Sequence, residues 1–147
     1  EMNEILERTT AKLESHVSTA TDGSFILAAQ HVLKQVVIAP HIQDFVTRLI
    51  LATHPDSEHA PNWIARDVIV GASPRGAQAI IRAAKVAAVI DGRFAVSLRD
   101  IKAVAVPALQ HRIVRSFEAQ TANRLAIDVI EELVREVPIL DKGVFHG

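Results

Sequence analysis

The sequence contains no cysteine among its 147 residues. This absence excludes disulfide bonds and metal sites built on thiolates, and it is compatible with a reducing compartment. No apolar run approaches the roughly 20 residues that a membrane-spanning helix needs, and no basic segment with an apolar core follows Met2 as in a signal peptide. We therefore expect a cytoplasmic protein without membrane contact. Because the sequence begins with Glu1, we expect a longer parent protein.

An excess of charge of one sign is also missing. Sixteen Lys and Arg stand against 17 Asp and Glu, which gives a formal net charge of −1. This balance argues against nucleic-acid binding. It also argues against a helix-turn-helix DNA-binding protein, although the helix start Arg75-Gly76-Ala77-Gln78 is compatible with one. The apolar fraction of 49% with 22% charged residues is typical of a globular protein of one domain or two compact subdomains.

The usual catalytic motifs are absent. The sequence has no Gly-x4-Gly-Lys-Ser/Thr phosphate loop and no strand ending in paired acids for magnesium. No Ser-His-Asp or Cys-His arrangement is apparent. His54 and His59, with Asp56 and Glu58 between them, lie in a polar segment without the i, i+4 spacing of helical ligands, so we predict no metal site.

Helical periodicity is the dominant pattern. Its clearest example is a continuous apolar stripe from Ile42 to Thr53. Val36-Val37-Ile38 and Phe94-Ala95-Val96 are short extended segments that could pair. We predict an all-α helical bundle with at most this short two-stranded β patch. The expected helices cover residues 2–20, 24–35, 40–53, 73–91, a segment opening at the capping box of Ser97 and Asp100 with a kink or break at Pro107, and 122–137.

A polar loop over residues 54–67 separates two of these helices. It has about 14 residues and two prolines, and loops of this length are often functional or mobile. Trp63 is the aromatic residue within it. We interpret Trp63 as a packing anchor, with a contact to a nucleotide or a protein as the alternative.

The segment Gly71-Ala72-Ser73-Pro74-Arg75 follows this loop. Ser73 is typical of an N-cap and Pro74 of a first helical residue. Arg75 then lies in the first turn, at the positive end of the helix dipole, where acidic residues are favoured. Either Arg75 is an ordinary solvated residue, or Arg75 and the free N–H groups of the turn face a phosphate supplied from elsewhere.

Several short motifs occur in one order along residues 32–138. They are Ala52-Thr53, the segment 68–77, Arg82-Ala83-Ala84-Lys85, Asp91-Gly92-Arg93, Val96, Asp100-Ile101, Leu109-Gln110-His111-Arg112 and the closing segment 129–138. This series resembles the C-terminal lid of a MoxR-type AAA+ ATPase. The resemblance implies a lid over residues 32–138. Residues 1–31 would then be a core-to-lid connection or the first lid helices, and residues 139–147 a loose tail.

The resemblance also implies a function. The family's sensor-2 arginine maps to Arg75, which would act as a catalytic residue and, with Ser73 and Pro74, bind ATP held by an N-terminal core in cis. ATP and Mg²⁺ are expected in the full-length ATPase and no cofactor in this chain alone, which should not hydrolyse ATP. The family works as rings, usually hexamers, that remodel or mature other proteins, often of von Willebrand factor A type.

The chain departs from the family pattern at His54, at Gly76 and, as a lesser change, at Leu98-Arg99-Asp100, where a Pro-Glu-Asp-type cap is common. His54 stands where Ala-Thr-Arg is usual, so a charged contact is weakened or replaced. Gly76 replaces a usual alanine, which should slightly weaken the start of the helix. The alternative function is a self-contained helical protein–protein interaction module without nucleotide chemistry, which would bind its partner unaided through an exposed apolar face.

Overall fold

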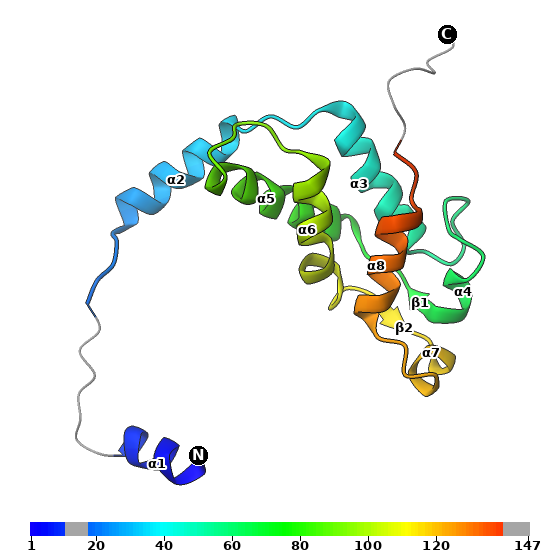
Figure 1. Cartoon of the computed structure of the whole chain (residues 1–147), viewed down its shortest axis with the longest axis horizontal. Coiled ribbons are helices and arrows are strands. Elements are labelled where there is room, and N and C mark those ends of the chain that lie inside the picture. Colours follow the sequence, from blue (N-terminus) through cyan, green and yellow to red (C-terminus); the bar gives the residue numbers. More distant parts are fainter. Residues whose placement is uncertain (11–17, 140–147) are drawn as a thin grey trace. The chain divides into compact units, whose positions relative to one another are not determined.

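The computed structural model of the protein describes residues 1–10 and 18–139 (Figure 1). The chain divides into two compact units, residues 1–30 and 31–147. The first contains helix α1 (Met2–Thr10) and most of α2 (Gly23–Gln35). Of the helix predicted over residues 2–20, the described part is α1, and residues 18–20 are not helical. Residues 11–17 and most of the predicted tail lie outside the described residues.

The second unit is helical with a small β patch, which confirms the predicted all-α class. Its sheet has two strands, antiparallel to each other. Its further elements are α3 (Pro40–Ala52), α4 (Ile64–Asp67), β1 (Val68–Val70), α5 (Pro74–Ile90), α6 (Leu98–Leu109), β2 (Val114–Arg115), α7 (Phe117–Thr121) and α8 (Ala126–Glu136).

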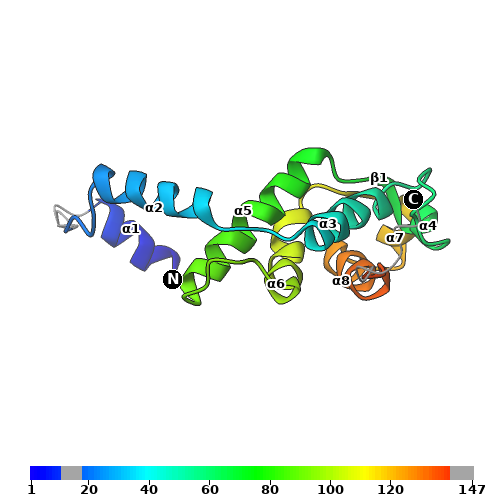
Figure 2. The ribbon, with the colours of Figure 1, turned by 90° about the horizontal axis from the view of Figure 1, so that it is seen from above.

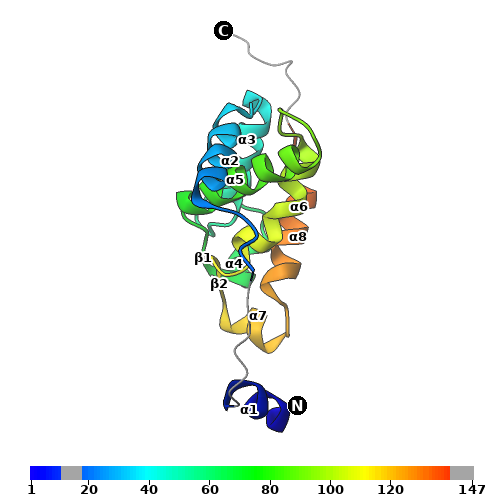
Figure 3. The same ribbon diagram turned by 90° about the vertical axis from the view of Figure 1, so that its left-hand side faces the viewer.

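The core of this unit lies between four helices. Helix α5 packs on α3 and α6 (Figure 2), and α6 packs on α8 (Figure 3). The predicted stripe of α3 is buried, with Phe45 and Leu49 fully enclosed. Ala84 and Ala88 give α5 a smooth buried face, which allows neighbouring helices to approach closely. Each large enclosed side chain contributes about 1.5–3 kcal/mol relative to exposure.

The β structure differs in place from the prediction. The expected pairing of the two extended segments exists as a single parallel bridge between Val37 and Ala95. In this bridge the N–H of Val37 donates to the carbonyl of Phe94 at 3.0 Å. The two-stranded sheet forms instead between β1 and β2, which places the chain immediately before Gly71 beside the segment that enters α7.

The helices differ from the prediction in three further respects. The helix predicted over 122–137 begins only at Ala126, because Asn123 adopts a left-handed backbone (φ 55°) that ends α7 and separates it from α8. The loop predicted over 54–67 contains the single-turn helix α4. Helix α6 is not divided at Pro107, which lies in the last turn of that helix.

Candidate functional site

The candidate site is the N-terminus of α5. Ser73 is in the extended conformation of an N-cap, and Pro74 is the first helical residue, as predicted. The Ser73 hydroxyl, however, makes no capping hydrogen bond, and the first turn contains no acidic residue. Neither the N-cap nor the first turn therefore supplies a side chain that neutralises the positive end of this 17-residue helix.

Arg75 lies in this first turn and is exposed. Among the described residues none forms a hydrogen bond or an ion pair with its guanidinium. Arg99 offers a comparison, since it is exposed at the equivalent position of α6. The first turn of α6 also holds Asp100, which supplies the negative charge that the turn of α5 lacks.

The backbone before α5 is held by the end of α3. The hydroxyl of Thr53 accepts a hydrogen bond from the N–H of Ala72 at 2.8 Å and donates one to the carbonyl of Ile50 at 2.6 Å. His54 Nε2 lies 2.9 Å from the carbonyl oxygen of Ala72. We call these two contacts to Ala72 the Thr53–His54 clamp. It occupies both backbone hydrogen-bonding groups of one buried residue.

Two glycines show how closely this loop is packed. A Cβ at Gly71 would lie 2.7 Å from the carbonyl oxygen of Thr53 and 2.7 Å from Cγ of His54. A Cβ at Gly76 would lie 2.9 Å from a methyl group of Leu109. Gly76 therefore allows α5 and α6 to pack closely. The sequence alone predicts only that Gly76 weakens the start of the helix and does not predict this packing role.

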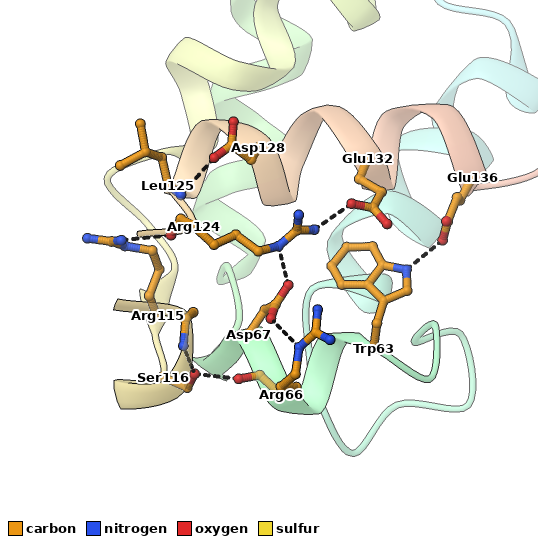
Figure 4. A network of polar contacts seen from close by, with 11 residues as sticks. Trp63, Arg66, Asp67, Arg115, Ser116, Arg124, Leu125, Asp128, Glu132 and Glu136 are labelled. Atoms are coloured by element: carbon orange, nitrogen blue, oxygen red, sulfur yellow. Dashed lines mark hydrogen bonds and ion pairs between the residues drawn. The ribbon is translucent and has the colours of Figure 1, made fainter. Parts of the chain in front are cut away.

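A polar network supports the elements that lead into β1 (Figure 4). Trp63 packs against the core, and its indole N–H donates to Glu136 at 2.8 Å. The guanidinium of Arg124 lies 5.2 Å from the centre of the indole ring. Such a stacked cation contributes about 0.5–1 kcal/mol. The interpretation of Trp63 as a packing anchor is confirmed.

Asp67 is the buried acid of this network, with 1% of its surface exposed. It accepts hydrogen bonds from Nε of Arg66 at 2.9 Å and from Nε of Arg124. Arg124 also pairs with Glu132, and this hydrogen bond raises the pKa of the guanidinium against the opposing effect of burial. The network ties α4 to α8 and to the segment before it.

A second network joins α5 to α6. Arg93 binds both carboxylate oxygens of Asp100, at 2.7 and 2.8 Å, and also Asp91 at 3.0 Å. The side-chain hydrogen bonds from Arg93 hold the pKa of the Asp100 carboxyl well below its ordinary value, against the effect of burial. The predicted capping box of Ser97 and Asp100 is present.

The histidines of the polar loop have separate contacts. His54 binds Ala72, whereas His59 lies 3.9 Å from a carboxylate oxygen of Glu58. In the described ranges, His, Asp and Glu side chains nowhere gather in the groups of three or more that could hold a metal ion. The described helices also include none that is long and apolar enough to cross a membrane.

Comparison with known proteins gives one family and several relatives. Residues 62–133 match the family model of the AAA lid domain. The chain is 30% identical to Chaperone MoxR1 of Mycobacterium tuberculosis over 109 residues, 74% of this chain and 28% of that protein. It is 47% identical to Protein MoxR of Paracoccus denitrificans over 49 residues, 33% of this chain and 14% of that protein.

One solved structure shares the fold. It is the crystal structure of a "putative ATPase" from Cytophaga hutchinsonii, with a TM-score of 0.79 and 27% identity. The match covers 95% of this chain and 43% of that one. The chain thus spans less than half the length of each protein that it matches. On these grounds the chain carries the lid domain of a MoxR-type AAA+ ATPase.

Proposed function

We propose that Arg75 is the sensor-2 arginine of this lid and contacts the γ-phosphate of ATP bound by an AAA+ core. The observation that carries the proposal is an exposed guanidinium, without a partner among the described residues, in a first turn that has no acid. Its position is fixed by the Thr53–His54 clamp and by Gly71. A fixed cation at a positive helix end is complementary to a polyphosphate.

The chemistry follows from this geometry. The guanidinium of Arg75 presents N–H groups to phosphate oxygens in a two-pronged arrangement. Negative charge on the equatorial oxygens increases toward the transition state of phosphoryl transfer, and Arg75 would stabilise it. Ser73 and Pro74 set the start of the helix and thereby the direction of Arg75. ATP with Mg²⁺ supplies the transferred phosphoryl group when bound by the core.

At the level of the whole protein we propose a cytoplasmic ATPase ring, such as a hexamer, that remodels or matures other proteins. The relative named as a chaperone supports protein clients. Clients of von Willebrand factor A type belong to this proposal. Within it, residues 32–138 form the lid, and residues 1–31 connect the lid to the core or add its first helices.

The test uses the full-length protein that includes the core. Arg75→Ala should lower ATP turnover by about 100-fold, the usual effect of removing one charged contact to a transition state. Arg75→Lys should restore part of the activity, because the charge remains but the two-pronged geometry is lost. Arg99→Ala is the matched control and should leave turnover unchanged. Normal turnover in Arg75→Ala would remove Arg75 from the mechanism.

A second candidate function is the interaction module without nucleotide chemistry. Helix α2 favours it, because it has no buried residue and exposes Phe25 and Leu27 by 65% and 63%. Such a module would bind a defined protein partner with this chain alone. Leu27→Asp should then abolish binding and Arg75→Ala should not. The ATPase lid instead predicts little binding by the chain alone.

A further inference from the structure

We infer that His54 is a positioning residue for Arg75, acting through the carbonyl group of Ala72. The inference rests on the proposed function, because it assigns a residue to the same phosphate contact. His54 stands at the end of α3, 18 positions before Ala72 in the sequence, and its Nε2 lies 2.9 Å from the Ala72 oxygen. A carbonyl oxygen only accepts, so Nε2 carries the proton and donates.

The clamp orients two successive peptide groups. The N–H of Ala72 belongs to the peptide group before its Cα, and the carbonyl belongs to the peptide group after it. Thr53 binds the first and His54 binds the second. With both planes held, the φ and ψ angles of Ala72 are fixed, and so is the direction in which the chain enters Ser73.

Few soft torsions remain between the clamp and Arg75. Proline restricts φ at position 74 to about −65°. The remaining backbone angles are those of Ser73 (φ −73°, ψ 169°) and of the first helical turn. Gly76 then packs against Leu109, which fixes the helix immediately after Arg75. The clamp therefore determines where the Cα of Arg75 lies relative to α3.

The two halves of the clamp differ in burial. Thr53 is fully buried, so its hydrogen bond satisfies a buried N–H and supports the fold. His54 is half-buried, and the ring also lies against Gly71. His54 is thus the half that can be changed without unfolding the domain.

The experiment measures kcat for ATP in the full-length protein. His54→Phe keeps a ring over Gly71 and removes the donor. It should lower kcat by about 10-fold, since misplacing a contact by about 1 Å costs up to 100-fold. His54→Gln should stay within about twofold of wild type, because its side-chain amide can donate at the same place. His54→Ala is measured alongside, so that a packing fault specific to the phenyl ring does not decide the result.

A double variant separates positioning from a structural role. If His54 acts only through Arg75, then His54→Phe/Arg75→Ala should have the same kcat as Arg75→Ala alone. A further 10-fold loss in the double variant would overturn the inference, as would normal kcat in both His54→Phe and His54→Ala or failure of His54→Gln to retain activity. Normal turnover in Arg75→Ala would instead reject the proposed function itself.

Discussion

Three arginines of the second unit, Arg75, Arg93 and Arg124, illustrate two contrasting environments. Arg93 and Arg124 each bind two carboxylates, one of them on a buried aspartate. Arg93 joins the consecutive helices α5 and α6, whereas Arg124 binds Asp67, which lies 57 positions away in the sequence. Arg75 is exposed in a turn without an acid and has no partner among the described residues. The contrast teaches that the guanidinium groups of Arg93 and Arg124, which hold the fold together, are neutralised by carboxylates of the chain, whereas no carboxylate among the described residues neutralises that of Arg75. Substitutions in the two environments should therefore affect different properties.

The largest effect on stability should come from Asp67→Ala. The substitution leaves Arg124 and Arg66 without their shared carboxylate, and breaking a buried pair from one side costs about 3–5 kcal/mol. Because Arg124 stays partly accessible to water, we expect the lower end, about 3 kcal/mol. Urea unfolding of this chain measures it. Asp44→Ala, at an exposed position of α3, is the control, and a loss below about 1 kcal/mol at Asp67 would contradict the structural role of the network.

Asp100→Asn should cost about 2 kcal/mol near neutral pH, the contribution of hydrogen bonds to a charged group. In wild type the folded-state pKa of Asp100 lies below its ordinary value of 3.8. Its stabilisation is therefore complete above that value and is lost as the pH falls below it.

The measurement is the melting temperature from pH 7 down to pH 2. The difference between wild type and Asp100→Asn should shrink as the pH falls below about 4. Asp91→Asn is the matched control, since the carboxylate of Asp91 is half-exposed and makes a single contact with Arg93. A difference that stays constant with pH would mean that the charge of Asp100 is not what Arg93 stabilises.

Thr53→Val should cost about 1–3 kcal/mol, because it leaves the buried N–H of Ala72 without a partner. Thr53→Ser keeps the hydroxyl and should cost less. Thermal unfolding of both variants gives the comparison. A loss in Thr53→Ser that exceeds the loss in Thr53→Val would assign the stabilisation to the methyl group and not to the clamp.

The sequence predicted the parts of the fold that depend on local pattern. The stripe of α3, the Ser73-Pro74 start of α5 and the capping box of α6 are each set by residues within about three turns of one another. The pairing of β1 with β2 escaped prediction, because strands of two and three residues contain too little periodicity to reveal a distant partner. The left-handed Asn123 that separates α7 from α8 is a local signal that the helical pattern concealed.

The candidate site also has a part that the sequence predicts and a part that it does not. The place of Arg75 in an uncompensated first turn follows from four neighbouring residues, so the sequence was sufficient for it. The clamp joins His54 to a residue 18 positions away, and the path of the intervening loop decides that they meet. The Asp67–Arg124 pair spans 57 positions. Contacts of this kind depend on the packed fold, and neither spacing nor residue type indicates them.

The smallest effect on stability should come from substitution of Arg75, and this substitution should stabilise the chain, whereas the others destabilise it. Arg75→Glu places a carboxylate at the positive end of α5, which stabilises a helix by about 0.3–1 kcal/mol. The gain should decrease in high salt, because the site is exposed. Arg82→Glu, in the middle of the same helix, lacks the dipole effect and serves as control.

Thermal unfolding of this chain measures the gain, and ATP turnover of the full-length protein measures its cost. A variant that is more stable and yet inactive would show that the cation is kept at an unfavourable position for the sake of a ligand. If Arg75→Glu instead destabilises the chain by more than about 0.5 kcal/mol, then Arg75 has a structural contact within the domain. Its environment would then resemble that of Arg93, and the contrast between the two would lose its basis.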